Sequence, residues 1–319
     1  MVNPVNTLYR TALLLLLISA WGCGQRAGES NSLLFTPDEN GVSLSENGSP
    51  VFYYRKTPKT LTGEYICNHY IHPLFSLEGD TLTQEFPEDH PYHRGIFWSW
   101  HQLYLDTLSL GDEWIMEDIS HEVREIRTST GPDAAKLILD VLWSSSRLEN
   151  GKGFMEELTE ITVHSLKSGI RMIDFEISLK ALVKGISLGG SDDEKGYGGF
   201  CARLKLPDDL AFTSKNGPVI PQTLQVSAGP WMDFSGSFGA SAKQSGLTIL
   251  CHPSTPNYPA PWILRQLSSM QNIVFPGRMR VEISQKEPTI LRYRLIVHEG
   301  AAGELDLEGL QAEYEATGR

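Results

Sequence analysis

The chain is dominated by short segments in which hydrophobic and polar residues alternate. In segment 173–179, Ile, Phe, Ile and Leu alternate with Asp, Glu and Ser, and segments 137–143 and 291–297 follow the same spacing. The side chains of a β-strand point alternately to its two faces, so each segment predicts a strand with one face in a core. Shorter strands are predicted at residues 51–54, 64–70, 96–100, 200–206 and 247–251.

Turn-forming sequences separate the predicted strands, and only one helix is expected. Asn-Gly pairs at residues 47–48, 150–151 and 216–217 are typical of tight turns. Near the C-terminus, Leu307, Leu310 and Tyr314 follow helical spacing. Many strands without intervening helices favour a large antiparallel β-sandwich over alternating β and α units. We therefore expect an all-β fold with a short C-terminal helix, formed by one domain over residues 33–319.

The N-terminal residues follow a different pattern, which predicts export. Arg10 precedes an apolar run at residues 11–20, an arrangement typical of a secretory signal peptide. The run is shorter than the ~20 apolar residues of a membrane span. Cys23 stands where a bacterial lipobox has its lipidated cysteine. We predict a lipoprotein-type signal at residues 1–22, a tether at residues 23–32, and a location in the periplasm or on the outer membrane; plain cleavage is the alternative.

Charge and cysteine content exclude several classes of protein. The formal net charge of −12 disfavours nucleic acid and anionic membrane surfaces as partners, because phosphate binding requires clusters of basic residues. We expect contact with a membrane only through the N-terminal lipid anchor. Cys67, Cys201 and Cys251 lack the Cys-x-x-Cys spacing of a structural zinc site. Whether two of them form a disulfide stays open at this point.

Reactive side chains are most concentrated in the segment Asp89-His90-Pro91-Tyr92-His93-Arg94-Gly95. Its proline disfavours a helix, so the segment is predicted to be a loop. We expect His90 or His93 to act as acid or base, with Asp89 orienting the imidazole. Arg94 is predicted to bind a substrate carboxylate or sugar oxygen. The alternative is a rigid surface loop whose histidines bond to backbone carbonyls.

Three further segments are predicted to contribute to the same groove. His72 follows a predicted strand and is assigned a catalytic role, with a buried structural histidine as the alternative. Tyr197 and Arg203 flank a glycine-containing stretch and are predicted to contact substrate. A proline-rich segment begins at His252, another substrate-binding candidate, and ends at Trp262, which is expected to stack on a sugar ring. The alternative is a rigid surface loop that packs Trp262 inward.

These motifs resemble those of the bacterial PmoA-like family, known as methane oxygenase PmoA. The resemblance spans about residues 60–300, and it rests on His72-Pro73-Leu74, Asp89-His90-Pro91-Tyr92-His93-Arg94-Gly95, Tyr197-Gly198-Gly199 and His252-Pro253 with Pro261-Trp262. Many members have histidine where this chain has Tyr92. The resemblance implies a secreted β protein, and the family name implies copper-dependent alkane oxidation. The layout is also similar to the β-sandwich of galactose-mutarotase-like proteins, whose histidines and carboxylate perform acid–base chemistry on a sugar.

We therefore expect a secreted or lipid-anchored, carbohydrate-active protein that performs acid–base chemistry of an epimerase or lyase type. Its ligand is predicted to be a carbohydrate or another small polar molecule, and this interpretation requires no cofactor. Two alternatives stay open. In the first, His72, His90, His93 and His252 bind a transition metal in an oxygenase-like metalloenzyme. In the second, the protein is a non-catalytic, glycan-binding component of the cell envelope.

Overall fold

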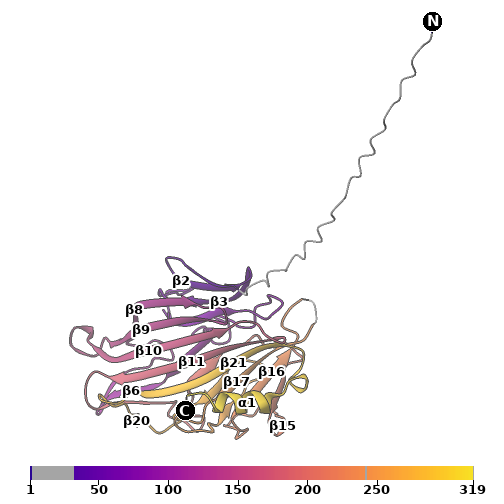
Figure 1. The fold of residues 1–319 in the computed structure, drawn as a ribbon. Coiled ribbons are helices and arrows are strands. Elements are labelled where there is room, and N and C mark those ends of the chain that lie inside the picture. Colours follow the sequence, from indigo (N-terminus) through magenta and orange to yellow (C-terminus); the bar gives the residue numbers. More distant parts are fainter. Residues whose placement is uncertain (2–31, 241–242, 319) are drawn as a thin grey trace. The chain divides into compact units, whose positions relative to one another are not determined.

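The computed structural model describes residues 1, 32–240 and 243–318, and their strands form three antiparallel sheets (Figure 1). In spatial order, the nine-stranded sheet contains β15 (Gly217–Pro218), β14 (Ala211–Ser214), β16 (Trp231–Gly236), β17 (Ser245–Cys251), β21 (Thr289–Glu299), β11 (Ile170–Ala181), β10 (Gly153–His164), β9 (Ala134–Ser145) and β8 (Ile119–Thr130). The eight-stranded sheet contains β1 (Leu33–Pro37), β2 (Gly41–Glu46), β3 (Ser49–Arg55), β4 (Tyr70–Leu74), β5 (Ile96–Trp100), β13 (Gly198–Ala202), β19 (Gln271–Val274) and β18 (Trp262–Ile263).

Smaller elements complete the fold of the described residues. The four-stranded sheet contains β20 (Val281–Glu282), β12 (Ile186–Gly189), β6 (Gln102–Leu105) and β7 (Leu108–Gly111). The helical elements are the short 3-10 turns η1 (Glu149–Gly151) and η2 (Ala302–Glu304) and the helix α1 (Leu307–Glu315).

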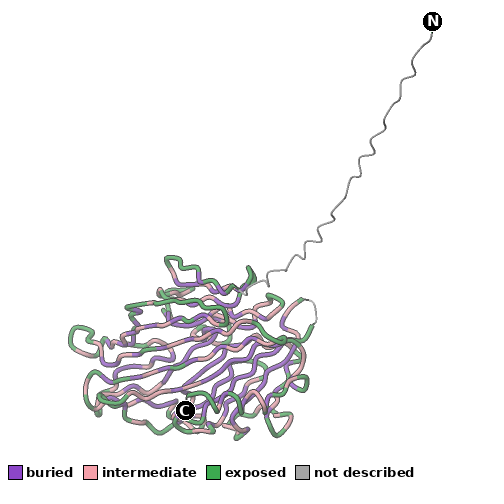
Figure 2. The backbone as a smooth tube through the Cα atoms, viewed as in Figure 1, coloured by how far each residue is buried: buried purple, intermediate pink, exposed green. Residues whose placement is uncertain are grey.

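The nine- and eight-stranded sheets pack face to face around aromatic side chains. Phe175 and Tyr293 are register partners on β11 and β21, and their ring centroids lie 5.2 Å and 4.7 Å from that of Phe200 on β13. Trp98 on β5 stacks on Phe200 from the same sheet. Along the long strands of the nine-stranded sheet, buried residues alternate with partly or fully exposed ones (Figure 2). The predicted antiparallel β-sandwich is confirmed.

The C-terminal helix covers the opposite face of the nine-stranded sheet (Figure 1). Asp306 caps its first turn, because the aspartate side chain accepts a hydrogen bond from the Gly309 N–H at 2.9 Å. Leu307 and Tyr314 pack against a cluster that includes Ile296 of β21. Neighbouring residues of β21 face the sandwich core, so the helix packs on the sheet's other side. The predicted short C-terminal helix is confirmed.

The alternating pattern located several strands correctly but failed where the backbone turns. The predicted strand at 96–100 coincides with β5, whereas the strand predicted at 64–70 is wrong for all but its last residue. Tyr65 and His69 have φ angles of 51° and 60°, which are incompatible with a strand. The prediction at 200–206 extends past the end of β13 at Ala202. The long strands β8 and β10 were not predicted.

The connection from β4 to β5 carries the histidine-rich loop and ends at Gly95. This glycine has φ +54°, and a Cβ atom there would lie 1.9 Å from the carbonyl oxygen of Ile71. Its N–H donates to the Gln84 carbonyl at 2.8 Å, and its carbonyl accepts from the Arg203 N–H at 2.7 Å. Only glycine fits this close backbone approach, so the end of the loop is held firmly beside the eight-stranded sheet.

The predicted signal peptide, the lipidation site at Cys23 and the predicted tether up to residue 31 lie outside the described residues, apart from Met1. In the described part of the chain, no helix has the length and apolar character of a membrane span. Cys67, Cys201 and Cys251 are buried free thiols, so no disulfide joins any two of them.

Candidate functional site

The segment 89–94 forms a compact, hydrogen-bonded loop. The His90 N–H donates to the Pro87 carbonyl at 3.2 Å, and the His93 N–H donates to the His90 carbonyl at 2.9 Å. The imidazole rings of His90 and His93 are consequently stacked, with centroids 4.7 Å apart and planes 2° from parallel. His90 and His93 are therefore held in a fixed arrangement relative to each other.

Asp89 connects this loop to two distant segments. Its Oδ2 atom lies 2.8 Å from His90 Nδ1 and accepts from the Ser269 N–H at 2.7 Å. The Arg203 guanidinium donates to both carboxylate oxygens, at 2.7 Å and 3.0 Å. Burial opposes ionisation, but the hydrogen bonds from Ser269, His90 and Arg203 outweigh it and hold the Asp89 pKa well below its usual value. An ionised carboxylate only accepts hydrogen bonds, so neutral His90 carries its proton on Nδ1 and leaves Nε2 free.

His93 lies almost fully buried behind His90, with 1% of its surface exposed. Burial is the main cause that lowers the pKa of His93 to about 2, and the positive charges of a protonated His90 and of Arg203 lower it further. Its Nδ1 atom has no hydrogen-bond partner among the described residues. His93 is therefore a neutral ring at pH 7 and a much weaker base than an ordinary histidine.

A second aspartate–histidine pair, which the sequence did not predict, lies near this loop, and its histidine lines the same cavity. His101 Nδ1 lies 2.8 Å from Asp112 Oδ2, and the Trp114 N–H donates to Asp112 Oδ1 at 2.9 Å. The His101 ring stacks on Trp114, with centroids 4.7 Å apart and planes 18° from parallel. The one sequence signal for this pair is the position of His101, directly after the strand β5.

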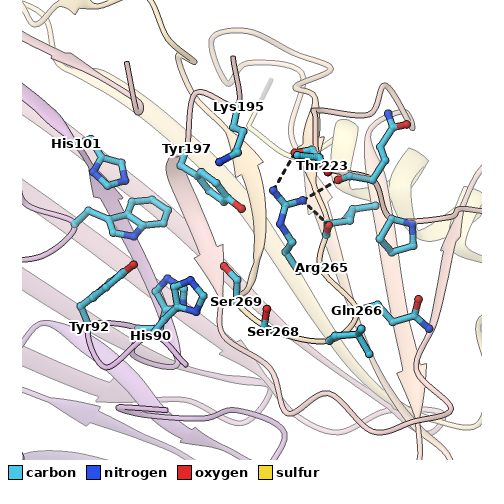
Figure 3. Close-up of a pocket in the computed structure, with 16 residues that line it drawn as sticks. His90, Tyr92, His101, Lys195, Tyr197, Thr223, Arg265, Gln266, Ser268 and Ser269 are labelled. Carbon is cyan, nitrogen blue, oxygen red and sulfur yellow. Dashed lines mark hydrogen bonds between the residues drawn. The ribbon is translucent and has the colours of Figure 1, made fainter. Parts of the chain in front are cut away.

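Tyr197 lies between these residues and Arg265, which stands on the opposite wall (Figure 3). The Tyr197 ring meets Trp114 edge to face at 5.5 Å, and the Arg265 guanidinium lies 5.4 Å from the centre of the Tyr197 ring. Arg265 Nη1 donates to the carbonyls of Gln222 and Leu264, both at 2.8 Å. These bonds hold the arginine side chain at the edge of the space.

These segments surround a cavity of about 660 Å³, within the size range of small-molecule sites. In the described part of the chain, it is lined by His90, Tyr92, His93, His101, Trp114, Lys195, Tyr197, Pro221, Gln222, Thr223, Leu264, Arg265, Gln266, Leu267, Ser268 and Ser269. His90, His93 and Tyr197 were predicted as site residues, and the structure brings them together here. No Asp or Glu is among these lining residues.

Arg94 and Arg203 do not line the cavity, contrary to the prediction that they bind substrate. Arg94 is 1% exposed and donates to the Trp114 carbonyl at 3.2 Å. Arg203 is also buried, and its guanidinium is bonded to Asp89. Both guanidinium groups are engaged inside the protein, so they position the loop and do not reach a ligand.

The prediction that Trp262 stacks on a sugar is also wrong, because its ring belongs to the sandwich core. It is 0% exposed, and its Nε1–H donates to the Gly229 carbonyl at 3.0 Å. The structure does not support the predicted substrate-binding role of His252 either. It is absent from the cavity lining, and its Nε2 atom lies 3.0 Å from the Thr317 carbonyl beside the C-terminal helix.

His72 lies on β4 and does not line the cavity either. Its Nδ1 atom lies 2.9 Å from the Thr83 hydroxyl, which agrees with the structural alternative. The proposed metal set of His72, His90, His93 and His252 does not converge. Among the described residues, no group of three or more His, Cys, Asp or Glu side chains could hold a metal ion.

A buried carboxyl, Glu113, precedes Trp114. The Trp100 N–H donates to its Oε2 atom at 2.9 Å, and its Oε1 atom lies 3.7 Å from Arg94 Nη2. Burial raises the Glu113 pKa to about 8, even though Arg94 and the Trp100 hydrogen bond favour ionisation. Glu113 does not line the cavity, so we expect its buried carboxyl to affect the stability of the fold and not the binding of a ligand.

Comparison with known proteins assigns the chain to a family. Residues 41–313 match the family described as "family of unknown function (DUF6807)", and the protein belongs to this family. No curated protein matches the chain. A solved structure of a candidate mutarotase from Salmonella typhimurium matches 84% of this chain and 90% of its own, with 10% identity and a TM-score of 0.31. That similarity is too low to support an argument, so the mutarotase-like and PmoA-like relationships stay predictions.

Proposed function

We propose that this protein performs acid–base chemistry on a sugar or a similar polar molecule bound in the cavity. The observation that carries the proposal is the pair of lining histidines, His90 and His101, each of which has Nδ1 2.8 Å from an aspartate oxygen. An Nδ1–H bonded to a carboxylate fixes the ring and leaves Nε2 free to accept or return a proton. Asp89 and Asp112 are thus positioning residues in this proposal.

The composition of the lining supports a sugar-sized polar ligand. Tyr92, Trp114 and Tyr197 contribute aromatic surface, on which the apolar C–H face of a sugar ring can pack. Hydroxyl and amide groups on the other wall, such as those of Thr223 and Gln266, are suitable partners for sugar hydroxyls.

The reaction that fits this lining best is proton transfer at a carbon beside a carbonyl, as in epimerisation or elimination. Hydrolysis of glycosides usually requires two carboxyl groups that flank the bond. The described lining residues include histidines but no Asp or Glu. Proton transfer by a positioned histidine contributes about 10²–10⁴ to a rate, which is sufficient for an activated C–H bond.

The proposal is tested by hydrogen exchange into a panel of sugars and sugar acids in D₂O, followed by NMR. We expect exchange with at least one panel member and a loss of about 100-fold or more in His90→Ala. His164→Ala is a matched control, because His164 Nε2 also lies 2.8 Å from an aspartate, Asp174, but does not line the cavity. The control should keep the wild-type exchange rate.

Two outcomes would contradict the proposal. If panel sugars bind to the wild type without exchange or product, the non-catalytic glycan-binding alternative is favoured. If His90→Ala and His164→Ala both exchange at the wild-type rate, proton transfer does not involve His90.

We also propose that the protein is exported and lipid-anchored at Cys23, which the signal-like residues before it support. Metabolic labelling with a fatty acid is expected to mark the wild type and to leave Cys23→Ser unlabelled. Equal labelling of both proteins would contradict the anchor.

A further inference from the structure

The cavity is lined by cations in a protein that is acidic as a whole. The chain has a formal net charge of −12, yet the described lining contains Lys195 and Arg265 and no carboxylate. Two acidic groups next to lining histidines are already bonded to protein partners, since Asp89 binds His90 and Asp112 binds His101. Lys195 is compensated in part, because its ammonium lies 3.5 Å from Asp193.

Arg265 has no such compensation among the described residues. Its guanidinium donates to three backbone carbonyls, those of Gln222, Leu264 and Thr223. None of these partners carries a charge, and no described carboxylate lies within ion-pair distance of Arg265. A guanidinium has five N–H donors, so the three carbonyls leave at most two, which the neighbouring Tyr197 hydroxyl and a ligand can share. The carbonyls fix the group in one orientation, which lowers the entropy that a ligand must overcome on binding.

We infer that the ligand is an acidic sugar whose carboxylate binds Arg265, while its ring faces the histidines of the opposite wall. This inference rests on the proposed function and names its substrate class. A guanidinium with free donors is suited to a carboxylate, which it can bind through two parallel hydrogen bonds. A sulfate ester would satisfy the same charge, but it does not activate a neighbouring C–H bond, so the carboxylate fits the proposed reaction better.

The assignment also explains how a histidine could remove a carbon-bound proton. His90 Nε2 takes the proton from the carbon next to the carboxylate, the C–H electron pair moves onto the carboxylate oxygens, and Arg265 stabilises that extra charge. Return of a proton from the His90 imidazolium to the same carbon regenerates the sugar, and in D₂O the returned proton is replaced by deuterium. If instead a β-oxygen leaves with its bonding electrons, a His101 imidazolium gives it a proton and a double bond forms. His101 then takes a proton back from water. In both reactions the atoms and charges balance without a further reactant besides water.

The experiment compares acidic sugars with neutral partners of the same shape. Binding of galacturonate, its methyl ester and galactose to the wild-type protein is measured by calorimetry, together with the glucuronate series and a sulfated galactose. We expect an acid to bind at least about tenfold more tightly than its ester, a factor that corresponds to about 1.4 kcal/mol. Equal affinity for acid and ester, tighter binding of the sulfated sugar, or no binding of any acid would overturn the inference.

Variants then locate the carboxylate-binding group. Arg265→Gln should remove the preference for the acid, whereas Arg127→Gln, on a surface arginine paired with Glu125, should keep it. A preference that persists in a folded Arg265→Gln contradicts the inference. If that variant does not fold, the wild-type comparison of acid with ester still decides the matter.

The two proposals can fail separately. An acid preference that depends on Arg265, without hydrogen exchange, supports the inference about the ligand and contradicts the proposed reaction. Exchange that depends on His90 but proceeds equally well with neutral sugars supports the reaction and contradicts the acidic ligand.

Discussion

Replacing Asp89 by asparagine tests whether one carboxylate holds the histidine loop to the rest of the site. Asparagine keeps the shape of aspartate but removes the charge that Arg203 binds at 2.7 Å and 3.0 Å. The Arg203 side chain is 4% exposed, whereas that of Asp89 is 32% exposed. The variant therefore leaves a nearly buried guanidinium without its anion. This unpaired buried charge lowers the stability of the folded protein.

Loss of one partner from a buried ion pair costs about 3–5 kcal/mol, and exposed pairs contribute about 0–1 kcal/mol. Because Asp89 is about one-third exposed, water offsets part of the loss. We expect the free energy of unfolding at pH 7 to fall by about 2–3 kcal/mol in Asp89→Asn, between these two limits.

The difference between the two proteins should depend on pH in a defined direction. The folded-state pKa of Asp89 is lowered, so its contribution is complete above the unfolded pKa of about 3.9 and is lost as the pH falls below it. Urea unfolding followed by tryptophan fluorescence at several pH values measures this. The stability gap should be constant between about pH 5 and pH 7 and should narrow in acid.

Asp118→Asn provides the control, because Asp118 pairs with Arg147, a far more exposed arginine. It should destabilise the protein much less than Asp89→Asn does. Equal unfolding free energies for wild type and Asp89→Asn at pH 7, or a gap that stays unchanged at pH 3, would refute the reasoning.

Three further variants test other parts of the fold. Gly95→Ala should destabilise the protein by more than about 1 kcal/mol in urea unfolding, since its φ is +54° and its Cβ would meet the Ile71 carbonyl; a neutral result would contradict this. The folded-state pKa of Glu113 is raised to about 8, so the wild type should lose unfolding free energy as the pH rises from about 4.5 to about 8. Glu113→Gln should lose less over this range, because glutamine does not ionise. Parallel plots of unfolding free energy against pH for the two proteins would contradict this. Trp262→Ala should cost about 3–5 kcal/mol as a core residue, whereas a surface stacking residue would cost little.

The fold class could be predicted from the sequence because local patterns carry it. In segments such as 137–143 and 173–179, side chains alternate with the period of a strand, and this period directly reflects which face is buried. The short helix was predictable for the same reason, from the spacing of Leu307 and Tyr314. The prediction failed at 64–70, where positive φ angles at Tyr65 and His69 interrupt the strand.

The candidate site was predictable only where it is local in sequence. Asp89, His90 and His93 lie within one loop, so their proximity follows from chain connectivity. The sequence did not indicate that Arg203 would bind Asp89, because the two residues are 114 positions apart. It also could not distinguish a buried Trp262 from an exposed one, since either environment is compatible with tryptophan.

The sequence by itself determined the alternation of strands, the short helix and the concentration of reactive groups at residues 89–95. Only the tertiary structure decided which of those groups face a common cavity. It placed His101 and Arg265 on opposite walls and turned Arg94 into the protein interior. The physical reason is that the direction of a side chain depends on strand register and on hydrogen bonds to distant segments, and neither is contained in local spacing.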